Sequence, residues 1–453
     1  MISDFFYFMK YVNPTWYFNL KPKVGDTPYF IDYRKLGHYH RPLVDFDKTF
    51  SSEDVSLLDA SFLAWHRGII EKDTSQALDF QSLENKPTLL DNYNFIKKYY
   101  NPIWTLYILL VRLFTFKNPF KEIPAYLKSL KTNRVYLSQP FHPHDDYRKF
   151  KPEILNSKPK VSIILPTLNR YKYLKDAILD LGKQTIPAHE IIVIDQTDDP
   201  DEKFYEQFDD LPLQLIFQDQ KGQWLARNKA IQQSTGDYIL MFDDDSRVDP
   251  DWTAEHLKAI EYFDADICAG VSLSTWGAAI PENYSFFRWA DQFDSGNALI
   301  KRNVFQTVGL FDRHYDGQRM GDGEFGLRAY LNGFKSISSP TAKRIHLKVP
   351  SGGLRQMGSW DGFRPKKLLD PRPIPSVVYL FRKYFGKQAT ILSLMTTVPP
   401  SIMPYKFKKS KPMLMLGFMV SLFFFPVVLL QVNKSWKLAS KMIEAGDRIE
   451  KLD

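Results

Sequence analysis

The chain has 453 residues, of which 44% are hydrophobic and 25% are charged, so a wholly disordered chain and a collagen-like repeat are excluded. Cys268 is the only cysteine, which excludes an intrachain disulfide framework and a cysteine-rich zinc module. Lys and Arg number 60 and Asp and Glu 52, a net charge of +8 that suits a membrane surface or a phosphate-bearing substrate as well as nucleic acid.

Residues 1–155 contain many aromatic residues and prolines but no motif that assigns them a role. The first residues lack a basic segment followed by an unbroken apolar stretch, so we expect no secretory signal. Residues 104–116 are apolar but short and contain Arg112, which is typical of a core or interfacial helix. His142 and His144 lie in a proline-flanked segment, where a surface loop is a simpler interpretation than a metal site.

After a lysine- and proline-rich linker, short apolar runs alternate with helical patterns at residues 173–181 and 224–233. The runs predict strands at Val161–Leu165, Glu190–Asp195, Leu213–Phe217, Tyr238–Phe242 and Asp266–Val271. This alternation predicts an α/β domain over residues 156–350, with a mostly parallel sheet and helices on both faces.

Polar sequences follow three of these strands, namely PTLNR at 166–170, DQT at 195–197 and DDD at 243–245. The carboxyl ends of parallel strands form one edge of a sheet, and ligands bind outside that edge. We therefore expect these side chains to share one binding edge.

The DDD sequence comprises Asp243, Asp244 and Asp245, whose charges repel each other unless positive charge compensates. Mg²⁺ and Mn²⁺ prefer oxygen ligands, and Asp243 and Asp245 could share one such ion. His346 follows a short predicted strand and could complete the site or contact a phosphate. The alternatives are an acidic turn that caps the next helix and a packed or solvent-facing histidine.

Two further candidates come from the second strand and from the helical pattern at 224–233. Asp195 ends a buried strand and could bind a nucleotide base or ribose, although a turn residue is the alternative. Arg227 and Asn228 fall in the first turns of the predicted helix, where a diphosphate can bind. The alternative for this pair is a solvated helix face.

Asp322 lies between two glycines in GDGEFG, residues 321–326, which has the formal spacing G-x-G-x-x-G. A dinucleotide site is excluded because no strand leads into the segment and its carboxylates would repel a pyrophosphate. An ionised carboxylate at the start of a helix suits a general base instead. An acidic helix N-terminus, favoured by the helix dipole alone, is the alternative.

Met413–Leu430 is a run without charged residues and has nearly the length of a membrane span. Lysines on both sides disfavour a simple crossing, because positive charge prefers the cytoplasmic side, and Pro426 would kink the segment. A monotopic or re-entrant anchor, a single span and a buried helix of a soluble core all stay open. The flanking lysines are Lys406, Lys408, Lys409, Lys411, Lys434, Lys437 and Lys441.

Six ordered segments over residues 159–348 resemble the family 2 glycosyltransferases of GT-A fold. The segments are VSIILPTLNR, EIIVIDQT, GQWLARNKAI, YILMFDDD, SGNALIKRNVFQTVGLFD and GDGEFGLRAYLNG. The resemblance implies a nucleotide-binding transferase domain at 156–350. This leaves residues 1–155 as a mixed accessory region of unknown role and residues 351–453 as a helical region, membrane-associated through the anchor candidate at 413–430.

The resemblance also implies residue roles. The donor-nucleotide pocket would comprise Pro166, Thr167, Asn169, Asp195, Arg227 and Asp244. Asp243 and Asp245 would be the metal ligands of a D-x-D motif, with His346 as a third ligand and Mn²⁺ or Mg²⁺ as the ion. Asp322 would be the catalytic base. Residues that contact the acceptor or support the base would be Glu324, Arg328 and Trp360.

Two departures from the family pattern affect the expected reaction. Gly321 replaces the usual acidic residue before Asp322. The Q-x-x-R-W signature of processive synthases is absent, and the nearest sequence, residues 356–360, has Ser359 in place of the arginine. We therefore expect single-sugar addition.

The expected function is an inverting transfer of one hexosyl or deoxyhexosyl group from a nucleotide-diphosphate sugar to a hydroxyl, by metal-assisted direct displacement. The acceptor would be a lipid-linked or cell-surface glycan at the cytoplasmic face of the inner (plasma) membrane, with no nucleic acid as partner. The alternative is a membrane-associated carbohydrate-binding or scaffold protein with a decayed transferase fold. Nucleotidyl transfer is disfavoured because PTLNRYKYLK has no glycine after the first strand.

Overall fold

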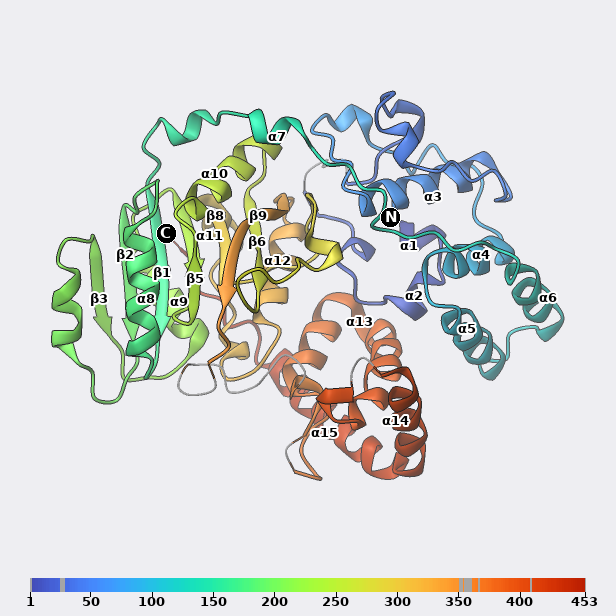
Figure 1. Cartoon of the computed structure of the whole chain (residues 1–453). Helices are drawn as coiled ribbons and strands as arrows, with labels where there is room; N and C mark the ends of the chain where they lie inside the picture. Colours follow the sequence, from blue (N-terminus) through green and yellow to red (C-terminus); the bar gives the residue numbers. More distant parts are fainter. Residues whose placement is uncertain are drawn as a thin grey trace.

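The computed structural model describes residues 2–24, 29–349, 353, 361–365, 367–407 and 410–452. Trp360, and with it the sequence at 356–360, lies outside the described residues. Figure 1 shows a group of N-terminal helices, a central α/β domain and a C-terminal helical group, coloured from blue to red along the chain. One large apolar core cluster includes buried side chains from all of them.

The described helices and strands have the following bounds. The α-helices are α1 Ile2–Phe5, α2 Met9–Val12, α3 Glu53–His66, α4 Leu89–Tyr99, α5 Ile103–Phe114, α6 Pro119–Ser129, α7 Asp146–Lys149, α8 Tyr171–Gly182, α9 Gln223–Gln233, α10 Trp252–Phe263, α11 Arg302–Val308, α12 Gly321–Leu331, α13 Pro375–Thr397, α14 Lys411–Phe423 and α15 Phe425–Glu444. The strands are β1 Val161–Thr167, β2 Glu190–Asp195, β3 Leu213–Phe217, β4 Tyr238–Phe242, β5 Ser246–Val248, β6 Ile267–Leu273, β7 Arg288–Trp289, β8 Asn297–Lys301 and β9 Ser336–His346.

The strands form one mixed sheet in the order β3-β2-β1-β4-β8-β6-β9-β5, and β7 pairs with β9. The four strands β3, β2, β1 and β4 are parallel, as predicted, but β8 is antiparallel to both β4 and β6. The prediction of a mostly parallel sheet therefore fails in the second half, where β6 and β9 pair in parallel but the other described pairs are antiparallel. Local sequence carries little sign of β8, because polar residues stand at both of its ends and only Ala298–Ile300 between them is apolar.

Helices cover both faces of the parallel half. The crossover β1–α8–β2 steps toward β3, whereas β3–α9–β4 steps in the opposite direction along the sheet. Because βαβ crossovers are right-handed, these opposite steps put α8 and α9 on opposite faces. Every residue of β1 and β2 is buried, which explains their continuous apolar sequences.

The N-terminal helices form an aromatic core that continues into the central domain. The rings of Phe6 and Phe95 stack with centroids 4.0 Å apart. Tyr17 donates a hydrogen bond to the carbonyl of Gly323 in α12, and Tyr330 of the same helix donates to the carbonyl of Leu20 over 2.8 Å. Residues 1–155 therefore support the helix that carries Asp322.

The C-terminal chain leaves the central domain and then returns to it. The backbone N–H of Leu310 donates to the carbonyl of Glu450 over 2.8 Å, and that of Arg313 donates to Arg448 over 3.2 Å. No single helix in the described part of the chain is long and apolar enough to cross a membrane. The helices α14 and α15 meet that test only as a pair, with an angle of 89° between them.

Candidate active site

The predicted binding edge exists at the ends of β1, β2 and β4. Thr167 and Asp195 are register partners in neighbouring strands, and residues 243–245 follow β4 directly. Pro166 is buried within β1, whereas Asn169 is exposed just beyond the strand, with φ at 54°. The strand ends thus bring together the polar groups that the sequence distributes over 79 positions, from 167 to 245.

Asp243 lies between two buried arginines. The Nη2 group of Arg227 donates to one carboxylate oxygen over 2.6 Å, and Nη1 of Arg344 donates to the other over 2.7 Å. Arg344 also pairs with Asp294 at 3.1 Å. A Cβ atom at Gly296 would lie 2.1 Å from both Asp243 Oδ2 and Arg344 Nη1, so only glycine leaves room for this ion pair.

Asp244 and Asp245 share a third arginine. Arg170 Nη1 lies 3.0 Å from an oxygen of each carboxylate, and Thr167 donates to Asp244 over 2.8 Å. Burial raises the pKa of Asp244 to about 6, although the charge of Arg170 opposes this. The pKa of Asp245 is lowered from its ordinary value. Burial acts to raise it, but the hydrogen bond from His346 and the charges of His346 and Arg170 have the larger combined effect.

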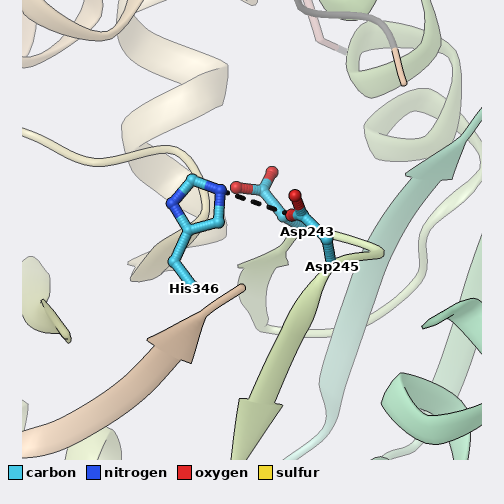
Figure 2. A group of neighbouring side chains, drawn as sticks. All are labelled: Asp243, Asp245 and His346. Atoms are coloured by element: carbon cyan, nitrogen blue, oxygen red, sulfur yellow. Dashed lines mark ion pairs between the residues drawn. The ribbon is translucent and has the colours of Figure 1, made fainter. Parts of the chain in front are cut away.

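Asp243, Asp245 and His346 form the candidate metal site, with one ligand atom of each within 4.8 Å of the others. Figure 2 shows the imidazole at the end of β9 facing the two carboxylates, and its Nε2 atom lies 3.4 Å from Asp245. Carboxylate and imidazole ligands suit a divalent cation such as Mn²⁺. Four carboxylates and three guanidinium groups leave one net negative charge, so the residues fit such an ion. These charged residues are Asp243, Asp244, Asp245, Asp294, Arg170, Arg227 and Arg344.

Asp195 is 1% exposed and is fixed from three directions. Its Oδ2 atom accepts hydrogen bonds from Tyr171 over 2.7 Å and Tyr205 over 2.8 Å, and Oδ1 accepts from the backbone N–H of Thr197 over 2.9 Å. The carboxylate therefore has a fixed orientation at the edge of the sheet, where a flat polar ligand could use its remaining acceptor capacity.

Asp322 lies in the first turn of α12, at the start of a helix as the sequence predicts. The backbone N–H of Ser295 donates to Asp322 over 3.3 Å, and the carbonyl of Ser295 accepts from Arg227, which pairs with Asp243. Gly321 lies against Trp224, since a Cβ atom there would be 2.4 Å from the indole ring. The space of the expected acidic neighbour is therefore filled by tryptophan.

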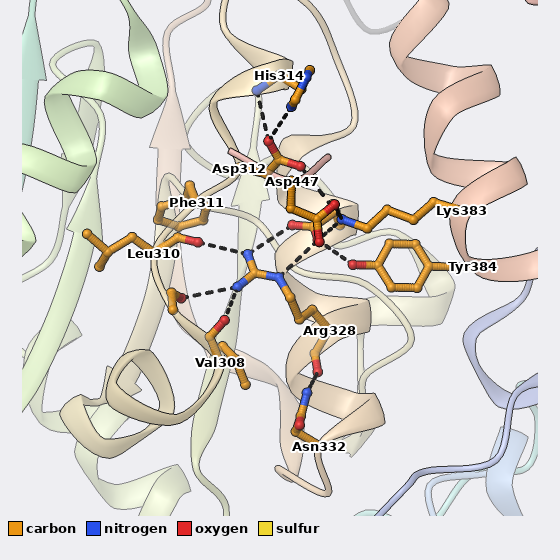
Figure 3. A network of polar contacts seen from close by, with 12 residues as sticks. Val308, Leu310, Phe311, Asp312, His314, Arg328, Asn332, Lys383, Tyr384 and Asp447 are labelled. Carbon is orange, nitrogen blue, oxygen red and sulfur yellow. Dashed lines mark hydrogen bonds and ion pairs between the residues drawn. The ribbon is translucent and has the colours of Figure 1, made fainter. Parts of the chain in front are cut away.

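Glu324 and Arg328 belong to a buried polar network of α12, and Figure 3 shows Arg328 in this network with Lys383, Tyr384 and Asp447. Glu324 is fully buried and accepts hydrogen bonds from Arg328 Nε over 2.9 Å and from Tyr384. Lys383 Nζ lies 3.6 Å from Glu324 and 2.8 Å from Asp447. These contacts join α12 to α13 and to the C-terminal tail. Glu324 and Arg328 therefore support the helix that carries Asp322, and their buried side chains do not face an acceptor.

Sequence reasoning placed Arg170 at the binding edge without giving it a role, and it missed Arg344 and Asp294 as members of the site. Arg344 stands two residues before His346 on the same strand, a spacing that puts both side chains on one face of β9. That periodicity was the one available signal, and it becomes informative only once the strand is recognised. Its partner Asp243 is 101 residues away in the chain.

A cavity of about 220 Å³ opens beside Asp294. Its walls come from β6, β7, β9 and the segments on either side of β7. Its polar lining residues are Ser272, Arg288, Gln292, Asp294 and Ser338. The cavity can accept a small polar group next to the arginine pair of Asp243.

Comparisons with known proteins match this central region. Residues 162–308 match the family model for Glycosyl transferase family 2. The chain is 29% identical over 164 residues to Glycosyltransferase AglE of Haloferax volcanii, across 34% of this chain and 53% of that relative. It is 26% identical over 175 residues to the Glucosyl-dolichyl phosphate glucuronosyltransferase of Haloferax volcanii, across 34% of this chain and 56% of that relative. The chain thus spans about half the length of these relatives.

Among solved structures, the crystal structure of S. aureus TarS 1-349 in complex with UDP-GlcNAc is similar to this chain. The TM-score is 0.43 at 15% sequence identity, and the match covers 63% of this chain and 92% of that chain.

We expect Lys383→Met to lower the unfolding free energy by about 1–3 kcal/mol, because buried Glu324 and Asp312 each lose a nearby cation. Thermal unfolding of the full chain measures this effect. Lys387→Met, an exposed lysine four residues further along the chain and beyond the kink at Gly386, is the control and should leave the melting temperature unchanged. Equal melting temperatures for both variants would contradict the supporting role of the network.

Proposed function

We propose that this protein, whose residues 162–308 form a family 2 glycosyltransferase domain, transfers one sugar from a nucleotide-diphosphate sugar to a hydroxyl acceptor. The observation that carries the proposal is the grouping of Asp243, Asp245 and His346 at the same sheet edge as Thr167 and Asp195. This complete acidic edge favours an enzyme over a carbohydrate-binding or scaffold protein with a decayed fold.

The donor nucleotide binds at the ends of β1 and β2 in this proposal. Asp195 accepts hydrogen bonds from the base, and its fixed carboxylate means that little side-chain entropy is lost on binding. Thr167 and Asn169 line the same edge. Arg227 is 1% exposed and already pairs with Asp243, so it acts on the donor through that carboxylate.

Asp243, Asp245 and His346 are the side chains that would hold the divalent cation. When bound there, Mn²⁺ or Mg²⁺ would offset the negative charge that develops on the leaving diphosphate. Arg227 and Arg344 already donate to the two oxygens of Asp243, so a cation would share that carboxylate with them.

Asp322 removes the proton of the acceptor hydroxyl as the oxygen attacks the anomeric carbon. A single attack from the face opposite the leaving diphosphate inverts the anomeric centre. The hydrogen bond from Ser295 orients the carboxylate, and general-base help of this kind contributes about 10²–10⁴-fold in rate. The cavity beside Asp294 takes part of the transferred sugar or of the acceptor, a hexosyl or deoxyhexosyl unit in either case.

The proposed acceptor is a lipid-linked or cell-surface glycan, and the proposed place of action is the cytoplasmic face of the inner (plasma) membrane. The name of the glucuronosyltransferase relative, which includes a dolichyl phosphate, supports a lipid-linked acceptor. The surface of α14 supports peripheral, monotopic or single-span membrane contact, because its apolar side chains lie outside the core. These side chains, 42–82% exposed, are Met415, Leu416, Phe418, Met419, Leu422 and Phe423.

We expect Asp322→Asn to keep donor binding but to lose sugar transfer by at least about 10²-fold, because the amide cannot take the acceptor proton. Transfer is measured with the donor that gives the largest thermal stabilisation in a nucleotide-sugar screen with Mn²⁺. Asp210→Asn, at an exposed position outside the site, is the control. Turnover near that of the wild type in Asp322→Asn would refute the assignment of the base.

We expect Asp245→Asn to weaken binding of the nucleotide-diphosphate sugar in the presence of Mn²⁺ or Mg²⁺, since one anionic ligand is lost. Titration calorimetry with the metal, and again with a chelator, measures the effect. In the chelator the wild type and the variant should bind alike. An affinity that depends on neither the metal nor the substitution would count against this metal site.

We expect the double variant Met419→Ser/Phe423→Ser to bind vesicles at least about tenfold more weakly than the wild type, because two large apolar side chains leave the bilayer. Flotation of the full chain with anionic vesicles measures the bound fraction. A wild-type chain that stays entirely in the aqueous fraction would refute membrane contact by α14.

A further inference from the structure

The helices α5 and α6 expose an apolar face that the transfer reaction does not use. In α5 the exposed apolar residues recur at i, i+3, i+7 and i+11, and in α6 at i, i+3, i+7 and i+10, so each set lies on one side of its helix. They are Ile103, Leu106, Leu110 and Phe114 in α5, and Phe120, Ile123, Leu127 and Leu130 in and just after α6. Phe116, in the connection, is 97% exposed.

The charges around this face have one sign. Between residues 103 and 136 the only acidic residue is Glu122, and it is buried. The exposed charged side chains of the same segment are Lys117, Lys121, Lys128, Lys131 and Arg134. Lys121 and Lys128 lie beside Phe120 and Leu127, so the apolar stripe has a cationic border.

The two helices form a rigid unit. Glu122 of α6 accepts hydrogen bonds from Arg112 of α5 over 2.6 and 2.8 Å, and from Tyr93 of α4 over 2.9 Å. Since these groups are buried, the hairpin has one orientation relative to α4. The apolar face is therefore preformed and points away from the N-terminal core.

We propose that the hairpin α5–α6 docks into the interfacial region of a lipid bilayer that carries anionic headgroups. A helix with aromatic and aliphatic residues on one face and lysines along its border is the arrangement that binds at such an interface. Each lysine adds attraction to anionic lipid, and the exposed phenylalanines enter the acyl boundary. A second copy of the chain fits less well, because lysine is depleted at protein–protein interfaces.

The position of the hairpin agrees with this occupant. Figure 1 shows α5 and α6 at the right of the view, at the end opposite β3, and the C-terminal helices α14 and α15 at the bottom, below the N-terminal group. The helix α13, which packs on α15, also packs on α2 of the N-terminal group. Two membrane contacts, one from each end of the sequence, would set the orientation of the central domain relative to the bilayer surface.

A single labelled cysteine tests the proposal in the full chain. Cys268 is the only cysteine and is 0% exposed, so a dye on Phe120→Cys reports from the hairpin alone. With vesicles of phosphatidylcholine and phosphatidylglycerol we expect a blue shift of an environment-sensitive dye and protection from a soluble quencher. The same dye on Tyr39→Cys, an exposed position in another part of the N-terminal region, should stay in water.

The double variant Lys121→Glu/Lys128→Glu tests the contribution of charge. We expect it to bind anionic vesicles at least about tenfold more weakly than the wild type, as measured from the bound fraction. A dye at residue 120 that stays in water while the chain floats with the vesicles would overturn the proposal, although α14 could still be an anchor. A blue shift without lipid that grows with protein concentration would overturn it in favour of a second copy. A chain that binds no vesicles at all would overturn it as well.

Discussion

Three consecutive aspartates at the end of β4 lie side by side because guanidinium groups from three other segments reach them. Arg170 follows β1, Arg227 comes from α9 and Arg344 from β9, and each contacts at least one of the carboxylates within 3.0 Å. Unpaired carboxylates at this depth would be neutralised or would not stay buried. The mixed sheet, and above all the position of β9, is therefore a requirement of the charge balance at the site.

The helix α12 is where the three parts of the chain meet. Tyr17 from the N-terminal helices contacts its first turn, and Tyr384 and Lys383 of α13 reach Glu324 from the other side. The C-terminal tail adds Asp447 to the same network. Because Asp322 is two residues from Glu324, the accessory regions hold the proposed base in place as well as adding surface.

The exposed apolar helices bear on how the molecule would be oriented relative to a bilayer. The proposed transfer from a water-soluble donor to a lipid-linked acceptor would need the binding edge open to water and the acceptor side near the lipid. The hairpin α5–α6 lies at the end opposite β3, and α14 and α15 lie at the bottom of the same view (Figure 1). Their side chains cost hydrophobic free energy in water, which a bilayer would relieve.

The local sequence pattern was enough to predict β1 to β4, α9 and the polar strand ends. A strand buried on both faces has a continuous apolar sequence, and a turn has characteristic polar residues, so each can be recognised from a few residues. The alternation of those strands with helices also predicts, from the sequence alone, that residues 167, 195 and 243–245 share one edge. Only the tertiary structure decided that β8 enters antiparallel beside β4, that Arg344 neutralises Asp243 from 101 residues away, and that α14 lies outside the core. The first two features depend on contacts between segments far apart in the sequence. The position of α14 cannot be read from its composition, because an apolar helix has the same composition whether it faces a core or a membrane.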